Sequence, residues 1–458
     1  MKKTFIHRSF IVLSIVLAWF MAGCKKYLDE KSSKKLVIPS NLTDLQALLD
    51  NYSTMNYSGA NSHEESTNDY YLTDADYTAL YSIFDQSMYT WQKEHLFDIG
   101  ANGNDWSYTY RAVYFSNSVL DELNQIARTS ANQTNWDNIK GQALVFRANR
   151  FLDALSIWSL AYDQTTAATD LGIPLRLDPD FNEKTVRASV QQSYQQVISD
   201  IRTAIPILPV TPASVLRPSK PAAYALLART YLWMRDYTRA GLYADSSLQL
   251  YNKLLDYNTL IPTDGYPVKD LNAETLFERA SALSDPLNNS VAKIDPLLYQ
   301  SYASNDLRKM IFFKANTDGS VGFKGCYVGN ATLFTGIATD EVYLTRAEYY
   351  ARQNNVTAAM ADLNTLLSKR WKTGKFIALT AATPADALTL ILQERRKELL
   401  MRGLRWMDIK RLNKEGASIS LQRTVNGQAY NLPAGDFRFA LPIPDDIISL
   451  AGITQNYR

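Results

Sequence analysis

Few residues of this chain could take part in covalent chemistry. The 458-residue sequence holds two cysteines, Cys24 and Cys326, and three histidines, His7, His63 and His95. A nucleophilic triad needs a histidine beside its nucleophile, and a zinc site needs histidine or cysteine ligands at close spacing. No such spacing occurs, so we expect no catalytic residue, no metal site and no cofactor. A pair of catalytic carboxylates, as in a glycosidase, is not excluded, because sequence spacing does not reveal the distance between two carboxylates in space.

Cys24 follows a segment with the features of a targeting signal. A basic start and an apolar run up to residue 23 have the layout of a secretory signal peptide, and the run is too short to span a bilayer. Residues 22–24 (Ala-Gly-Cys) resemble the bacterial lipobox, whose cysteine is acylated and becomes the new N-terminus, although Met21 replaces the usual leucine. Two or more acyl chains hold a protein stably on a membrane. We therefore expect residues 1–23 to be a leader and residues 24–40 a lipidated tether.

The composition of the remaining chain is that of a large globular protein. Hydrophobic residues make up 46% of the sequence, and the chain is long enough to bury a sizeable core. The formal net charge is +2, and the predicted leader carries three basic residues, so the mature chain is close to neutral. A near-neutral chain argues against nucleic acid as a partner. We expect a single domain over residues 41–458.

Apolar residues recur at helical spacing along most of this domain. The clearest helical ranges are 41–52, 105–128, 136–162 and 190–208. Two further segments, 221–251 and 340–370, repeat large and small residues across a turn, as tetratricopeptide hairpins do, because alanines let paired helices approach closely. The prediction is a mostly α fold with hairpins of this type near 136–162, 221–251 and 340–370. Unrelated amphipathic hairpins are the alternative.

Two long regions show little helical period. Residues 52–104 and 251–335 hold glycine, proline and asparagine at close intervals. Loops of that length in a compact chain are usually functional or disordered. We therefore expect the helices to form a scaffold and these two loop-rich regions to bind a ligand.

The segment 391–413 carries the most specific pattern in the chain. Its distinctive residues are Glu394, Arg395, Glu398, Arg402, Gly403, Arg405, Trp406, Asp408 and Arg411. They strongly resemble the C-terminal signature of the SusD/RagB family of outer-membrane nutrient-binding lipoproteins, and residues 441–458 resemble that family's closing segment. Because charges three or four residues apart can pair on a helix, we expect this segment to lock the fold through ion pairs rather than to catalyse.

The resemblance implies a SusD-like helical scaffold and a function. A family member would be held on the outer membrane through Cys24, exposed at the cell surface, and would bind an oligosaccharide or similar nutrient. It would deliver that ligand to a TonB-dependent transporter of the SusC type. Two alternatives remain, a peptide- or glycoprotein-binding relative of the same family and a surface glycosidase.

Candidate ligand-binding residues follow from the chemistry of sugars. A sugar ring presents an apolar C–H face ringed by hydroxyls, so flat aromatic side chains flanked by amides can hold it. Trp91 is the one tryptophan that lies in a long loop-rich region, at a chain position where relatives carry part of their aromatic platform. The expected site residues are Trp91, Tyr89, Asn102 and Asn104 from the first loop-rich region, and Tyr266 and Tyr327 from the second.

Overall fold

The computed structural model describes residues 40–98 and 103–458. The predicted leader, Cys24, nearly all of the tether and Asn102 lie outside the described residues. Within the described ranges the chain forms seventeen α-helices and ten short strands, so the prediction of a mostly α fold is confirmed. None of these helices combines the length and the apolar character that a membrane span requires.

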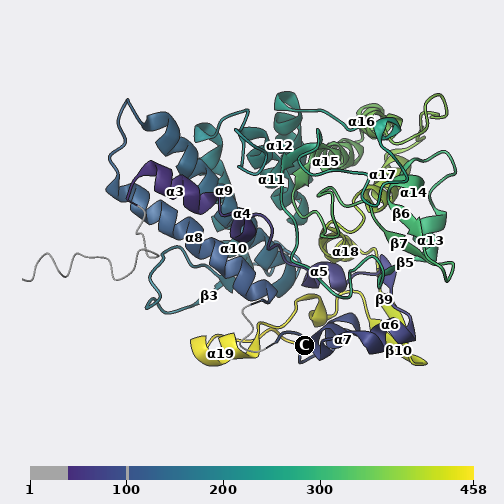
Figure 1. Ribbon diagram of the computed structural model, residues 1–458, viewed down its shortest axis with the longest axis horizontal. Helices are drawn as coiled ribbons and strands as arrows, with labels where there is room; N and C mark the ends of the chain where they lie inside the picture. Colours follow the sequence, from purple (N-terminus) through teal and green to yellow (C-terminus); the bar gives the residue numbers. More distant parts are fainter. Residues whose placement is uncertain (1–39, 99–102) are drawn as a thin grey trace, which may run out of the picture.

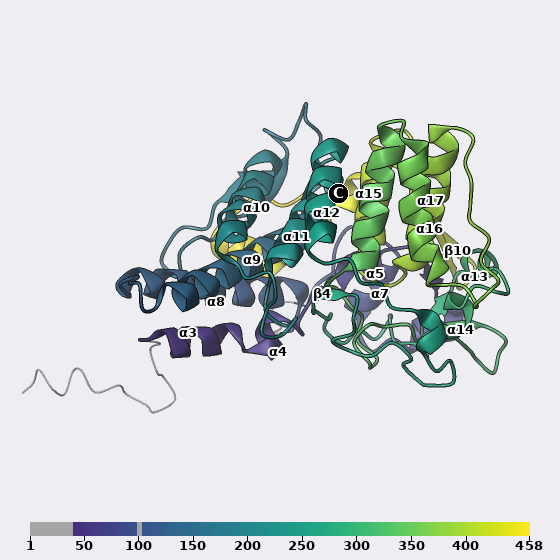
Figure 2. The ribbon, with the colours of Figure 1, turned by 90° about the horizontal axis from the view of Figure 1, so that it is seen from above.

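Long helices form the scaffold, and those of its central part stand next to one another in chain order (Figures 1 and 2). They are α3 (Leu42–Leu49), α8 (Asp105–Gln125), α9 (Gln133–Trp158), α10 (Val190–Ala204), α11 (Lys220–Trp233), α12 (Tyr237–Leu250), α15 (Thr339–Arg352), α16 (Val356–Ser368) and α17 (Pro384–Glu398). Helices α11 and α12 pack as one hairpin, α15 and α16 as the next, and α12 packs on α15. Each hairpin therefore covers one face of the next hairpin.

Small residues allow the helices of these hairpins to pack closely. Gly241 of α12 lies against Tyr349 of α15, where an added Cβ would stand 2.0 Å from a ring carbon. Asp236 begins α12 by accepting the backbone N–H of Arg239, which satisfies a donor that a helix start leaves unpaired. The hairpins at 221–251 and 340–370 thus occur where the repeated spacing predicts helix pairs.

The hairpin expected near residues 136–162 is instead a single helix. Helix α9 runs unbroken from Gln133 to Trp158 and packs on α8 before it and α10 after it. From Ile139 onward nearly all of its residues are buried. A helix that is covered on all sides has no polar turn at which the chain could fold back into a hairpin. The apolar stripe of α9 therefore marks one long helix.

The loop-rich regions contain short elements and a core of their own. Their helices are α4 (Tyr52–Met55), α5 (Ser62–Glu65), α6 (Asp74–Ala79), α7 (Ile83–Tyr89), α13 (Pro296–Gln300) and α14 (Arg308–Ile311). A second hydrophobic cluster fills the space between them and is rich in aromatic rings, among them Tyr70, Tyr89, Tyr257, Tyr302, Phe312 and Tyr327. Many loop aromatics are therefore core residues.

Five two-stranded antiparallel sheets pair short strands of the chain. They pair β1 (Tyr70–Tyr71) with β5 (Lys293–Ile294), β2 (Leu171–Pro174) with β3 (Arg187–Ser189), β4 (Thr275–Phe277) with β8 (Ile337–Ala338), β6 (Phe313–Ala315) with β7 (Val321–Phe323), and β9 (Leu421–Val425) with β10 (Gln428–Leu432). In the first pair Tyr70 lies opposite Ile294, so the two loop-rich regions are joined directly.

The charged C-terminal segment is not one continuous helix. Helix α17 ends at Glu398, and α18 (Arg405–Asn413) begins after a turn in which Met401 and Gly403 take positive φ angles. The short helix α19 (Asp445–Ala451) follows near the end of the chain. The expected pairing along a helix is confirmed for Asp408 and Arg411, which lie three residues apart and meet at 2.8 Å. For most of the other charges it is wrong, because the turn separates them and points them at other elements.

The partners of these charges come from across the chain. Arg395 meets Asp408 at 2.8 Å, Arg402 meets Asp340 at 2.6 Å, and Arg411 meets Glu348 at 2.7 Å. Glu398 binds two guanidinium groups, those of Arg308 and Arg370, at 2.9 and 2.6 Å. All these groups are buried.

We expect Arg370→Leu to destabilise the fold by about 3–5 kcal/mol, because removing one partner of a buried ion pair leaves a buried charge uncompensated. Arg370 also binds Glu274 at 2.7 Å, so two carboxylates lose a partner. The midpoint of urea unfolding measures the effect. Arg128→Leu is the control, since its ion pair with Asp137 is largely exposed and its loss should leave the midpoint nearly unchanged. Equal midpoints for the two variants would contradict this view of the network.

Candidate functional site

A cleft opens where the two loop-rich regions meet, beside α5 and α7. Figure 1 shows where these two helices lie. Its volume is about 240 Å³, and both regions line it together with the first turn of α8. We call it the loop cleft, and it is lined by Asn61, Ser62, Glu65, Ser82, Phe84, Asp85, Met88, Leu96, Phe97, Asp98, Gly103, Asn104, Asp105, Tyr108 and residues 282–285. Pockets that enclose a small molecule usually measure about 300–1,000 Å³, so this cleft suits one part of a larger ligand.

Asp105 forms the fixed floor of the loop cleft. Its carboxylate accepts hydrogen bonds from the backbone N–H groups of Asn61 and Ser62, and from the Ser62 hydroxyl at 2.5 Å. Burial raises the pKa of this carboxyl, and the hydrogen bonds from Ser62 and Asn61 oppose that shift. The side chain thereby fixes the start of α8 against the start of α5.

Two further acids line the loop cleft with raised pKa values. Burial, reinforced by Asp85 and Asp105, raises the pKa of Glu65 to about 8, while the Ser284 hydroxyl donates to its carboxyl at 2.7 Å. Burial and the nearby Asp285 raise the pKa of Asp85 to about 6. At neutral pH the Glu65 carboxyl is therefore largely protonated, so it can donate as well as accept a hydrogen bond.

Exposed apolar side chains stand at the rim of the loop cleft. The Tyr81 ring is 98% exposed and Leu283 is 79% exposed. The backbone N–H of Tyr81 donates to Asp285 at 3.3 Å, which ties the rim of one loop-rich region to the other. Tyr81 is an exposed ring next to the lining residue Ser82, and the sequence reasoning did not single it out. Its position in the first loop-rich region was the available signal, but nothing in the sequence distinguishes an outward tyrosine from a buried one.

Trp91 and Tyr89 do not face the loop cleft. Trp91 is 2% exposed, and its indole N–H donates to the Ser66 carbonyl at 3.0 Å. Tyr89 is equally buried and its hydroxyl accepts the Leu72 N–H at 2.7 Å. The Arg423 guanidinium lies over both rings, at 4.6 and 3.8 Å from their centroids. In this structure neither ring has a free face for a sugar, so we assign both to the core.

The remaining expected residues are scattered. Tyr327 is buried, hydrogen-bonded to Tyr257 at 2.7 Å and to Glu274 at 2.8 Å, so it too is a core residue. Tyr266 is half-buried and accepts a hydrogen bond from Asn289, away from the loop cleft. Asn104 does line the cleft, where its side chain caps α8 through the Ser107 N–H. The structure therefore gathers the two predicted regions but brings only Asn104 of the described candidates into the cleft.

We predict that Glu65→Gln changes how stability depends on pH. An ordinary glutamate pKa is 4.5, so between about pH 4.5 and 8 the unfolded chain releases a proton that the folded Glu65 retains. Stability from this group falls as pH rises through that window. The thermal midpoint of the variant, relative to wild type, should rise across the window and level off above it.

Calorimetry of both proteins from about pH 4 to 9 makes the comparison. Glu183→Gln is the matched control, because that side chain is exposed and should give a curve parallel to wild type. Parallel curves for Glu65→Gln would show that this carboxyl is not held protonated.

Two protein-family models match this sequence. Residues 26–232 match a SusD-like family model described as "Starch-binding associating with outer membrane", and residues 339–457 match the model of the SusD family. A comparison with curated proteins finds no match.

Solved structures share the fold over nearly their full length. A SusD superfamily protein from Bacteroides thetaiotaomicron is 23% identical, with a TM-score of 0.72 over 91% of this chain and 100% of that one. A SusD-like carbohydrate binding protein from Bacteroides vulgatus is 20% identical, with a TM-score of 0.68 over 90% of this chain and 96% of that one. The two family models cover most of the sequence and the fold agrees: the chain belongs to the SusD/RagB family.

Proposed function

We propose that this protein binds carbohydrate at the loop cleft and takes part in glycan uptake at the outer membrane. The observation that carries the proposal is the cleft itself, which is lined by buried carboxyl groups at the junction of two loop-rich regions. The exposed Tyr81 directly precedes the lining residue Ser82, and its backbone N–H donates to the lining residue Asp285. The family description, starch-binding with outer-membrane association, and the carbohydrate-binding neighbour from Bacteroides vulgatus support it.

The chemistry of the loop cleft suits sugar hydroxyls. The largely protonated Glu65 can donate to a hydroxyl oxygen, while Asp85 and Asp98 offer carboxylate acceptors. The Tyr81 ring at the rim offers an apolar face for the C–H side of a sugar ring. Because the cleft is small, it would hold one part of an oligosaccharide while the rest lies over the rim.

A glycosidase is the alternative that the raised pKa of Glu65 would favour, since general acids need such a shift. Its neighbour Asp105 argues against it. That carboxylate is already bound by two backbone N–H groups and a hydroxyl, which suits a structural anchor better than a nucleophile. A peptide- or glycoprotein-binding relative remains the other candidate, and the test below separates all three.

We predict that Tyr81→Ala weakens glycan binding by at least several-fold while the thermal midpoint stays unchanged. Stacking of an aromatic ring on a planar ligand contributes about 1–3 kcal/mol by analogy with nucleobases. Affinity electrophoresis against starch, xylan, arabinan, mannan and pectin identifies the polysaccharide, and calorimetry measures the loss. Phe181→Ala is the control, because this ring is 79% exposed but stacks on Tyr114 outside the loop cleft.

Each contrary outcome has a distinct meaning. Wild-type affinity in Tyr81→Ala would remove the loop cleft as the site. Release of reducing ends from any polysaccharide would identify a glycosidase. Binding of peptides but of no polysaccharide would identify the peptide-binding relative.

We further propose that Cys24 carries a lipid anchor and that the protein docks on a SusC-like TonB-dependent transporter, to which it delivers the glycan. The lipobox resemblance of residues 22–24 and the family support this. Delivery requires a stable contact, and stable interfaces bury about 1,600 Å² in total.

Membrane fractionation tests the anchor and the partner together. The wild-type protein should incorporate labelled fatty acid and co-purify with a β-barrel protein in mild detergent. Cys24→Ala should leave the membrane fraction and lose the label. An unlabelled wild-type protein that is always recovered alone would contradict both parts.

A further inference from the structure

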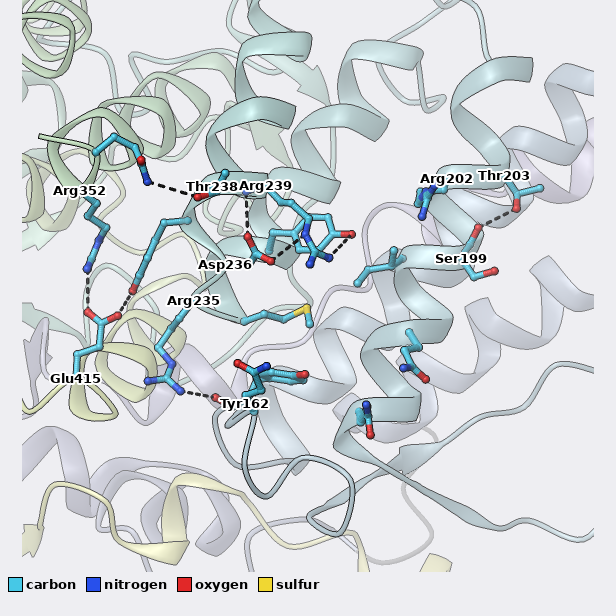
Figure 3. Close-up of a pocket in the computed structure, with 18 residues that line it drawn as sticks. Tyr162, Ser199, Arg202, Thr203, Arg235, Asp236, Thr238, Arg239, Arg352 and Glu415 are labelled. Carbon is cyan, nitrogen blue, oxygen red and sulfur yellow. Dashed lines mark hydrogen bonds and ion pairs between the residues drawn. The ribbon is translucent and has the colours of Figure 1, made fainter. Parts of the chain in front are cut away.

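A second, larger hollow lies on the helical hairpins, away from the loop cleft (Figure 3). Its volume is about 1250 Å³. One wall is α10, and the other is formed by the turn between α11 and α12 together with the end of α15 and the residues after α18. We call it the hairpin groove. Its size and open shape suit an extended chain rather than a compact small molecule.

The α10 wall presents a row of polar side chains that have no partner of their own. Gln191, Gln195 and Arg202 follow one another at intervals of four and seven residues, so they lie along one face of the helix. In the part of the chain that the structure describes, none of these three side chains makes a hydrogen bond or an ion pair. Figure 3 shows Ser199 and Arg202 on this wall. The row therefore offers amide donors and acceptors and one uncompensated cation.

The opposite wall adds a second uncompensated cation. Arg235 stands at the turn between α11 and α12 with a φ of 62°, and its guanidinium reaches only backbone carbonyls, those of Tyr162 at 3.2 Å and Lys414 at 3.3 Å. Its buried Nε has no partner within the described residues. Arg239 and Arg352, by contrast, are paired with carboxylates. The groove thus carries excess positive charge at Arg202 and Arg235.

Two of the three aromatic rings that line the groove, Tyr231 and Tyr237, are already covered. Arg352 lies 3.6 Å from the centroid of the Tyr237 ring. The Tyr231 ring stacks on Tyr243 at 5.5 Å with an interplanar angle of 6°, and Arg239 lies 5.0 Å from its centroid. The third ring, Tyr162, makes a T-shaped contact with Tyr194 at 5.4 Å. The groove therefore has no platform of several open rings for the apolar side of a sugar. Unpaired amides and arginines without a carboxylate partner match a peptide instead, because a peptide main chain pairs with amides and acidic side chains pair with guanidinium groups.

We propose that the hairpin groove binds an extended acidic segment of a partner protein. Gln191 and Gln195 hydrogen-bond its main chain, and Arg202 and Arg235 meet its carboxylates. The site is separate from the loop cleft, so a peptide and a glycan can be bound at the same time.

Fluorescence anisotropy with a labelled decapeptide of alternating glutamate and alanine tests the proposal at low and high salt. Binding should weaken with salt, and the peptide of alternating glutamine and alanine should bind far less tightly. Arg202→Glu should reduce affinity about ten-fold, because it removes a charge-assisted bond and adds repulsion. Gln195→Leu should reduce it several-fold with no change of charge.

Lys375→Glu is the matched control, since it makes the same change of charge on an exposed loop outside the groove and should bind as wild type does. Arg202 and Gln195 are exposed, so thermal midpoints should not change. A photo-crosslinking version of the peptide should label α10. The proposal is overturned by an Arg202→Glu variant that behaves like Lys375→Glu, by absence of binding at low salt, or by oligogalacturonate binding where the peptide does not.

Discussion

The fold depends on arginines that are buried together with their carboxylates. Arg308 and Arg370 both bind Glu398 at the end of α17, and Arg370 also reaches Glu274 in the second loop-rich region. Each of these side chains is fully buried. Removing such charges from water costs several kcal/mol per ion, which only well-placed partners offset. The network therefore forms only when segments far apart in the sequence take up one specific arrangement.

Buried arginines also hold together the described parts of the long loops. Arg423 lies over the rings of Tyr89 and Trp91, and Arg402 lies 4.7 Å from the centroid of the Tyr327 ring. A guanidinium group over an aromatic face is attracted by the ring and fills the space beside it. Rings that looked available for a ligand are thereby packed, and the loop-rich regions have an aromatic core beside their short helices and strands.

This construction gives two separate surfaces on one scaffold. The loop cleft lies where the two loop-rich regions meet beside α5 and α7, and its buried Asp105 fixes α5 against α8. The hairpin groove lies between α10 and the turn that joins α11 to α12. Both positions are held by packed elements. Proposed glycan binding and proposed peptide binding thus use different chemistry: carboxyl groups that face hydroxyls in the loop cleft, and amides with arginines that lack a carboxylate partner in the hairpin groove.

The sequence determined the local elements and the family. Apolar spacing located the scaffold helices, glycine and proline located the loop-rich regions, and residues 391–413 pointed to SusD/RagB. Only the tertiary structure decided which loop aromatics face water and which charges pair. Periodicity reports neighbours within a helix, whereas Trp91 is buried by Arg423, more than three hundred residues later, and Tyr81 is left exposed. Contacts between distant segments produce no periodic pattern in a single sequence. Which aromatic rings are exposed therefore depends on the tertiary structure.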